Sequence, residues 1–289
     1  MRFALFLGCN IPARLQDYDL SSRAVLGRLG VDLTDIREFN CCGYPIRNFD
    51  FKAFLLSSAR NIALANRHHL DMLVLCKCCY GSLKKADDVL RNDMSLREEI
   101  NRILSEEGLK FEGNSEIKHL LSVMYHDIGI KKIKENITRP YSDLKIAVHY
   151  GCHALRPSPI VQFDDPVAPS LFDSLVEVTG AESIFWSTKL ECCGAPLLGI
   201  NDELSRDLTI RKLSDGRKSG ADYLCTACPY CQMQFETVQK SKDVQDVGIL
   251  TPSPVLFPQL LGLAMGISNG RLGIQTDQHG SNAIEAFLT

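Results

Sequence analysis

The sequence predicts an α/β fold with two pseudo-symmetric repeated halves, each built on a small parallel sheet flanked by helices, with a cysteine cluster at the strand ends. Three observations predict this fold: a cysteine pattern that occurs twice, the alternation of strand-like and helix-like segments around it, and a length of 289 residues. At roughly 100 to 200 residues per domain, this length suits two domains or one fold with two halves.

The cysteine pattern consists of a lone cysteine after glycine, an adjacent pair followed by Gly-x-Pro, and a CxxC. The first set is Cys9, Cys41, Cys42, Cys76 and Cys79, and the second set is Cys152, Cys192, Cys193, Cys228 and Cys231. Between the lone cysteine and the pair lie 31 residues in the first half and 39 in the second; between the pair and the CxxC lie 33 and 34. The same order at nearly the same spacing indicates a duplicated site.

The segments around the cysteines alternate between strand and helix patterns, which is typical of α/β proteins. Four short apolar runs predict strands that end at cysteines, at residues 2–7, 72–75, 145–150 and 223–226. Helical patterns begin near Gly81 and Gln232 and also cover 13–29, 52–68, 169–179 and 202–219. Cysteines that follow parallel strands occupy the usual position for sites in open α/β sheets.

Two segments have no equivalent in the repeat. Residues 92–134 are expected to form a charged helical insertion of the first half. Arg139-Pro140 and the polar turn after it mark a boundary, so the expected domains are 1–143 for the first repeat and 144–289 for the second. The carboxyl end, 270–289, is polar and rich in glycine, and we expect a loose tail or a docking strap there.

Composition and charge exclude several classes of partner. A net charge of -3 gives no attraction to nucleic acid. Residues 1–8 lack the cleavage site of a secretory signal, and the apolar stretch 254–267 is shorter than the ~20 residues that a membrane span needs. The chain is therefore expected in the cytoplasm, where clustered cysteines bind metal or do redox chemistry more often than they form disulfides.

Five cysteines in each half exceed the four ligands of a structural zinc site. An adjacent pair is a strained chelate for one tetrahedral ion, but its two thiolates can reach different irons of a larger cluster, so the pattern favours an iron-sulfur centre over a zinc-binding module. The glycine after each pair would let the backbone approach inorganic sulfide closely. Cys78 and Cys225 have no counterpart in the other half and are expected to pack as spare thiols.

These motifs resemble those of the CCG-domain proteins, and nearly the whole chain is similar to the family of heterodisulfide reductase B subunits. The resemblance rests on both cysteine blocks and on further segments: YGCH at 150–153 with RPS at 156–158, ECCGAP at 191–196, CYGSL at 79–83 and QLLGLA at 259–264. It implies that the first set of five cysteines binds one noncubane 4Fe-4S cluster and that the second set binds another.

The resemblance also implies a function in methanogenesis: one-electron steps at the two clusters that reduce the mixed disulfide of coenzyme M and coenzyme B. The implied partners are a ferredoxin-like C subunit and a flavin-containing A subunit, with a hydrogenase or formate dehydrogenase in larger complexes. The sequence itself lacks a dinucleotide or flavin fingerprint, so electrons must come from another protein. Two alternatives stay open: an electron-transfer protein without a disulfide substrate, and one that oxidises thiols or other sulfur compounds.

Three polar residues close to the cysteines are further candidates. His153 directly follows Cys152, and since the pKa of histidine is close to neutral it could protonate a departing thiolate; the alternative is a structural histidine. Lys77, inside the first CxxC, and Arg156 are expected to neutralise cluster charge or to bind anionic groups of the substrate.

Overall fold

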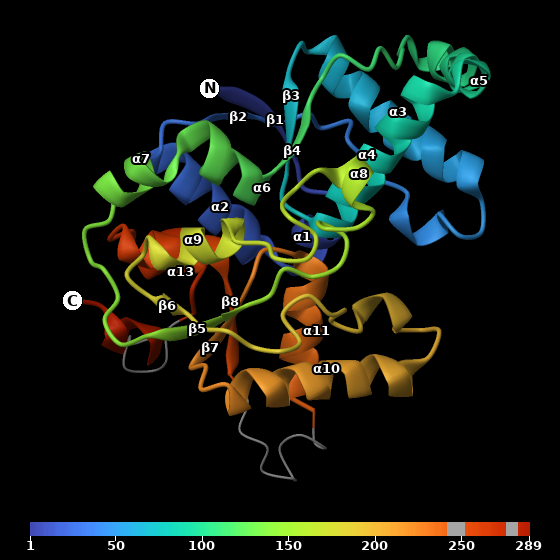
Figure 1. The fold of residues 1–289 in the computed structure, drawn as a ribbon. Helices are drawn as coiled ribbons and strands as arrows, with labels where there is room; N and C mark the ends of the chain where they lie inside the picture. Colours follow the sequence, from blue (N-terminus) through green and yellow to red (C-terminus); the bar gives the residue numbers. More distant parts are fainter. Residues whose placement is uncertain (242–251, 276–282) are drawn as a thin grey trace.

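The computed structural model describes residues 1–241, 252–275 and 283–289, which form two four-stranded parallel sheets (Figure 1). The first sheet has the strand order β2-β1-β3-β4, and the second has the order β6-β5-β7-β8. The strands are β1 (Arg2–Phe6), β2 (Asp32–Thr34), β3 (Asp71–Val74), β4 (Ile117–His119), β5 (Lys145–Val148), β6 (Glu182–Ser183), β7 (Tyr223–Thr226) and β8 (Ser253–Leu256). Equal strand order in the two sheets confirms the predicted α/β fold with two repeated halves.

Helices flank both sheets. In the first half they are α1 (Asn10–Arg14), α2 (Gln16–Arg28), α3 (Phe51–Arg67), α4 (Lys77–Asn92), α5 (Met94–Leu104), α6 (Leu120–Ser122) and α7 (Ile130–Glu135). In the second half they are α8 (Ser158–Val161), α9 (Leu171–Glu177), α10 (Asp202–Lys218), α11 (Pro229–Gln239) and α13 (Phe257–Ala264). The caps of α3 and α10 are equivalent, because the side chains of Asp50 and Asn201 each accept a hydrogen bond from the backbone N–H three residues later.

Several helix boundaries differ from the expected ones. The helix expected at 13–29 is broken at Leu15, whose backbone leaves the helical region, into α1 and α2. The helices expected from Gly81 and Gln232 begin at Lys77 and Pro229. Each CxxC therefore lies at a strand-to-helix junction, with its first cysteine in the extended N-cap position.

The segment 92–134 is not only a charged helical insertion. It contains β4, which pairs in parallel with β3 as β8 pairs with β7. Part of the segment therefore completes the first sheet and has a counterpart in the second half. The helix α5 has no such counterpart among the described residues and lies at the outer end of the first half (Figure 1).

Helices of each half pack on helices of the other half. α13, which follows β8, packs on α2 of the first half, and α6, which follows β4, packs on α9 of the second half. In the same manner α8 packs on α4, and α1 packs on α11. The buried hydrophobic residues accordingly form one continuous core that includes both halves.

The carboxyl end is packed where the structure describes it. The backbone N–H of Thr289 donates to the carbonyl of Pro140 at 3.0 Å, and Leu288 forms an antiparallel bridge with Tyr141. Ile284 is buried. The loose tail expected at 270–289 is therefore wrong for 283–289, which returns to the boundary between the halves, while 276–282 lies outside the described residues.

Candidate metal centre

The cysteines of each half collect at the carboxyl ends of the two central strands of its sheet. The lone cysteine follows β1 or β5, the CxxC follows β3 or β7, and the adjacent pair precedes a 3-10 turn, η1 (Tyr44–Ile46) or η4 (Ala195–Leu197). The first set lines one small cavity. Four cysteines of the second set line another, and the fifth, Cys192, is hydrogen-bonded to Cys152. We call these the first site and the second site.

The adjacent pairs are held by the helix that follows them. Ser58 donates to the carbonyl of Cys42 at 2.6 Å, and Thr209, its equivalent in the second half, donates to the carbonyl of Cys193 at 2.8 Å. Gly194 has a left-handed φ of +93° and faces α10, where an added Cβ would lie 2.2 Å from the carbonyl oxygen of Ser205. The glycine after the pair thus permits close packing on the helix. The expected approach of its backbone to inorganic sulfide stays a prediction.

The glycines that precede the lone cysteines lie beside a thiol of the CxxC. Gly8 and Gly151 both have left-handed backbones, with φ of +65° and +74°. A Cβ on Gly8 would lie 2.9 Å from the Sγ of Cys79, and one on Gly151 would lie 3.9 Å from the Sγ of Cys231. At Gly8 a side chain would therefore clash with the thiol, whereas at Gly151 the left-handed backbone rather than the thiol favours glycine.

The thiols of each site are too close to ionise independently. The Sγ atoms of Cys9 and Cys41 are 3.8 Å apart. Hydrogen bonds from Cys42 and Cys9 lower the pKa of Cys41 to about 2, while its hydrogen bond to Cys41 and burial raise the pKa of Cys9. The second site repeats this division, with the pKa of Cys192 lowered to about 2 by hydrogen bonds from Cys152 and Cys193. Such sets of thiols ionise together only around positive charge, which fits a metal centre.

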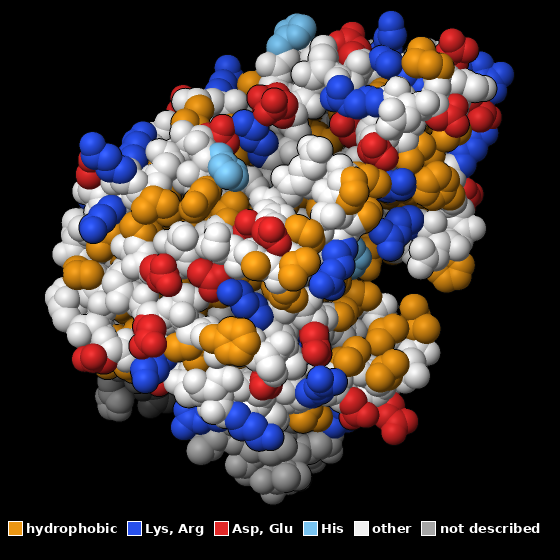
Figure 2. Space-filling view, in the orientation of Figure 1, with side chains coloured by type: hydrophobic (Ala, Val, Ile, Leu, Met, Phe, Trp, Pro, Cys, Tyr) orange, Lys and Arg blue, Asp and Glu red, His pale blue; other side chains and the backbone are white. Residues whose placement is uncertain are grey.

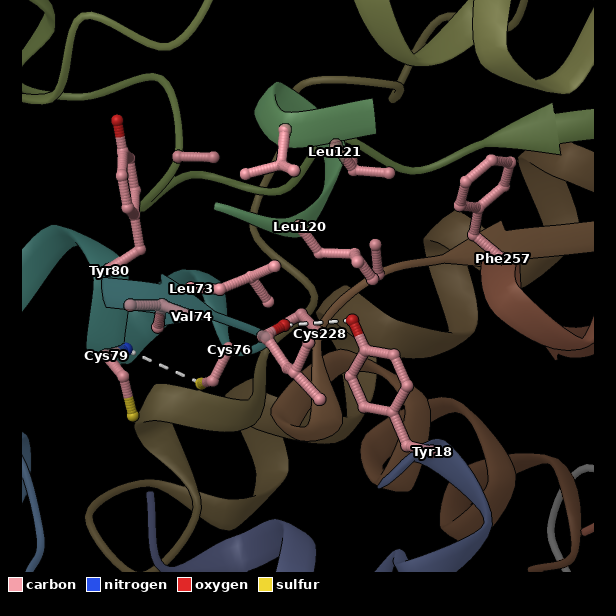
Figure 3. Close-up of a cluster of buried hydrophobic side chains, with 14 of the residues drawn as sticks. Tyr18, Leu73, Val74, Cys76, Cys79, Tyr80, Leu120, Leu121, Cys228 and Phe257 are labelled. Atoms are coloured by element: carbon pink, nitrogen blue, oxygen red, sulfur yellow. Dashed lines mark hydrogen bonds between the residues drawn. The ribbon is translucent and has the colours of Figure 1, made fainter. Parts of the chain in front are cut away.

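Cysteine side chains form a wall between the two sites. Cys78 lines both cavities, and the Sγ atoms of Cys76, Cys78 and Cys228 all lie within 4.8 Å of one another. Figure 3 shows Cys76 of the first set next to Cys228 of the second, in the same buried cluster. Cys78, expected to be a spare thiol, thus lies between the two sites. Cys225 is fully buried in β7 and lines neither cavity.

Aromatic rings form the rest of this boundary. The ring of Tyr44 meets His153 edge to face at 5.0 Å and Tyr230 at 5.9 Å, and Tyr230 lines both cavities. Figure 2 shows a notch on one side of the molecule, between the part with α3 and α5 and the part with α10, with hydrophobic side chains on both rims. The loops that follow η1 and η4 expose Phe49 by 88% and Ile200 by 77%, at equivalent positions. The loops of the cysteine pairs therefore also present apolar surface.

The structure places the three polar candidates differently. The Nδ1 of His153 is 3.5 Å from the Sγ of Cys152 and 3.4 Å from that of Cys78, and burial lowers its pKa. Lys77 belongs to the first CxxC, yet it is buried and lines the second cavity. Arg156 is exposed and lines neither cavity; its backbone N–H donates to the carbonyl of Cys152.

Sequence reasoning missed two buried residues of the second site. Lys212 of α10 lies 4.5 Å over the ring of Trp186 and donates to the carbonyl of Thr188, and burial lowers its pKa to about 8. His149 follows β5 and lies within 4.8 Å of the Sγ atoms of Cys193 and Cys231. No motif marks either residue; when the halves are aligned on their cysteines, His149 stands opposite Phe6 and Lys212 opposite Asn61.

Among the described residues, no helix is both long enough and apolar enough to span a bilayer.

Comparisons with known proteins agree with this geometry. The model of a family described as the CCG cysteine-rich domain matches residues 3–84 and 146–236. The chain is 39% identical to the B subunit of the ferredoxin:CoB-CoM heterodisulfide reductase of Methanosarcina mazei over 280 residues, covering 95% of this chain and 92% of that protein. It is 33% identical to the 8-methylmenaquinol:fumarate reductase membrane anchor subunit of Wolinella succinogenes, covering 94% and 95%.

A crystal structure of a hypothetical protein from Helicobacter pylori superposes with a TM-score of 0.72 at 19% identity, covering 97% of this chain and 52% of that one. At this level of identity the likeness concerns the fold alone.

Proposed function

The chain belongs to the CCG cysteine-rich domain family, in which its relatives include heterodisulfide reductase B subunits, and from this premise we propose that it is the catalytic subunit of a heterodisulfide-reductase-type complex. Its reaction is the two-electron reduction of a disulfide or the reverse oxidation of two thiols. The wall formed by Cys76, Cys78 and Cys228 supports this function most directly, because it joins two sites that each suit a one-electron centre.

The proposed cofactors are two noncubane 4Fe-4S clusters, one on each set of five cysteines. When bound, they supply two electrons in single steps at neighbouring positions. The chain contributes left-handed turns at Gly8 and Gly151 before the lone cysteines, adjacent pairs fixed by Ser58 and Thr209, and thiols that need positive charge among them. The buried ring nitrogens of His149, beside Cys193 and Cys231, have no hydrogen-bond partner among the described residues and suit a group held in the second site.

Reduction of a disulfide consumes two electrons and two protons and yields two thiols. His153 touches both Cys152 and Cys78, so its ring lies where a departing thiolate would take up its proton. The rings of Tyr44 and Tyr230 lie at the same boundary and would hold the substrate against the sulfur wall. These residues bind, orient and transfer a proton, while the electrons enter from elsewhere in the complex.

The proposed substrate is the mixed disulfide of coenzyme M and coenzyme B, because the Methanosarcina mazei relative carries both coenzymes in its name. The proposed partners are a ferredoxin-like C subunit and a flavin-containing A subunit, alone or with a hydrogenase or formate dehydrogenase. We expect the complex in the cytoplasm. Two exposed apolar loops beside the cysteine pairs, with Phe49 and Ile200, offer a surface for one of these partners.

The purified complex, reduced without oxygen, tests this function. On addition of the mixed disulfide we expect release of both thiols and reoxidation of the clusters, seen in their spectra. A symmetrical disulfide of unrelated thiols serves as the substrate control and should react more slowly. Unchanged spectra together with no free thiol would contradict the catalytic assignment, and a colourless protein that contains zinc would contradict the clusters.

A second candidate is an electron-transfer protein of the complex that binds no disulfide. The relative from Wolinella succinogenes favours it, because that protein is named as part of a fumarate reductase. In that case the reduced complex would pass electrons to a partner. Addition of fumarate would then reoxidise the clusters, and addition of the disulfide would not. In a protein that oxidises thiols or other sulfur compounds, addition of the thiol would instead reduce the oxidised clusters, which their spectra would show.

A further inference from the structure

His149 is held firmly at the end of β5. Its backbone N–H donates to the carbonyl of Cys225 at 2.9 Å, and its carbonyl accepts from the Nζ of Lys77 at 3.0 Å. The ring is fully buried and packs edge to face on Phe235 at 5.1 Å. Neither the backbone nor the ring can turn away from its surroundings without breaking these contacts.

Both ring nitrogens of His149 are buried without a hydrogen-bond partner in the described part of the chain. Native proteins pair the large majority of such atoms, so we expect a partner other than the described residues. The direction is fixed by Gly151, since a Cβ there would lie 3.4 Å from the Nε2 of His149 and 3.9 Å from the Sγ of Cys231. Nε2 therefore faces the second site next to a cysteine of its set.

The first half provides a natural comparison. There, a Cβ on Gly8 would lie 3.7 Å from the Cε1 of Phe6 and 2.9 Å from the Sγ of Cys79. Phe6 thus occupies the place of His149 on an equivalent backbone, and presents an aromatic C–H where the second site has a ring nitrogen. The polar group is specific to the second site and is not demanded by the fold.

Lys77 adds a positive charge on the same side. Its Nζ is bound to the carbonyl of His149 and lies 4.9 Å over the ring of Phe172, while its side chain lines the second cavity. The equivalent residue in the second CxxC is Pro229, which has no charge to offer the first site. Charge and hydrogen-bond donors therefore gather around one of the two sites.

We propose that the Nε2–H of His149 donates a hydrogen bond to a sulfur of the cluster held by the five cysteines of the second site and, together with the Lys77 ammonium, raises the reduction potential of that cluster. Hydrogen bonds to sulfur and nearby positive charge stabilise the more negative, reduced form of such a cluster. The inference rests on the proposed function only in taking a cluster to be present.

The variant His149→Phe gives the second site the residue of the first. In the purified complex we expect full iron content and a lower reduction potential for one cluster, measured by redox titration followed by electron paramagnetic resonance. His149→Gln keeps an N–H donor and should recover most of the shift. Phe6→His is expected to raise the potential of the other cluster, and His126→Phe, at an exposed position, should change neither.

Three outcomes would overturn the inference. They are an unchanged potential in His149→Phe at full iron content, loss of one cluster in that variant with no recovery in His149→Gln, and a strong nitrogen coupling from ¹⁵N-labelled histidine that indicates a direct bond to iron. A weak coupling that disappears in His149→Phe supports the hydrogen bond. Failure of the proposed function is distinct, because the wild-type complex would then lack iron or would not react with disulfide.

Discussion

The two halves share the positions of their cysteines but differ in what surrounds them. Strand order, the glycine before the lone cysteine and the hydroxyl that anchors the adjacent pair are the same in both. The first site has Phe6 and Asn61 where the second has His149 and Lys212. The duplication thus retained what positions sulfur and changed what sets the electrostatics, so two sites of equal shape need not be equal in redox behaviour.

The largest effect is expected when one of two equivalent cysteines, either that of the first half or that of the second, is removed. We expect Cys42→Ala and Cys193→Ala each to lose about half of the iron, and disulfide reduction to fall by more than about 100-fold, because one electron source is missing. Iron and sulfide analysis with an activity assay measures both. Cys225→Ala, which removes a buried thiol outside both cavities, is the matched control. Loss of all iron in either variant would show that the sites do not assemble separately.

The boundary between the sites is tested by His153→Gln. The substitution removes the ring that touches Cys152 and Cys78, and we expect disulfide reduction to fall about 100-fold, as is common for the loss of a general acid, at full iron content. His126→Gln serves as the control. A variant with wild-type rates would make His153 a structural residue, and one that loses iron would assign it to the metal site.

The glycines after the two adjacent pairs give a smaller, graded effect. Gly43→Ala and Gly194→Ala both force a left-handed alanine, which costs about 1–2 kcal/mol. Gly194→Ala should lose more, because its Cβ would lie 2.2 Å from the carbonyl of Ser205, against 3.0 Å from that of Phe54 for Gly43→Ala. Urea unfolding of the metal-free variants measures the difference. Equal losses, or a larger loss for Gly43→Ala, would contradict this order.

Lys212 gives the smallest effect, and it depends on pH. Burial lowers its pKa to about 8 from the ordinary 10.5, so the unfolded chain holds the proton between these values and the protein gains stability as pH rises through that window. Lys212→Met removes the cost of burying the charge. In the metal-free protein we expect the variant to be more stable than wild type at pH 7, by about 1–3 kcal/mol, and the difference to shrink towards pH 10.

Chemical unfolding at both pH values measures this difference. Lys218→Met, at an exposed position of the same helix, is the control and should leave stability unchanged at either pH. A difference that grows with pH would show that the lysine is stabilised by its surroundings, for instance by thiolates, and would reverse the assigned direction.

Local sequence signals were sufficient for the fold class and for the cysteine positions, because duplicated cysteines and apolar runs before them are visible in the chain itself. They were not sufficient for β4, a three-residue strand inside a charged segment, whose pairing depends on β3. They also could not place Lys77, which is next to a cysteine of the first set but faces the second site. Its direction follows from the packing of one half on the other, which no local pattern records.

The reciprocal packing of helices has a consequence for how the protein is made. α2 is synthesised long before α13, the helix that covers it. The first half therefore has an uncovered apolar face until α13 has been made, and the contacts that close the core join residues far apart in the chain, which slows folding. A first half produced without α13 would therefore leave the apolar face of α2 exposed to solvent.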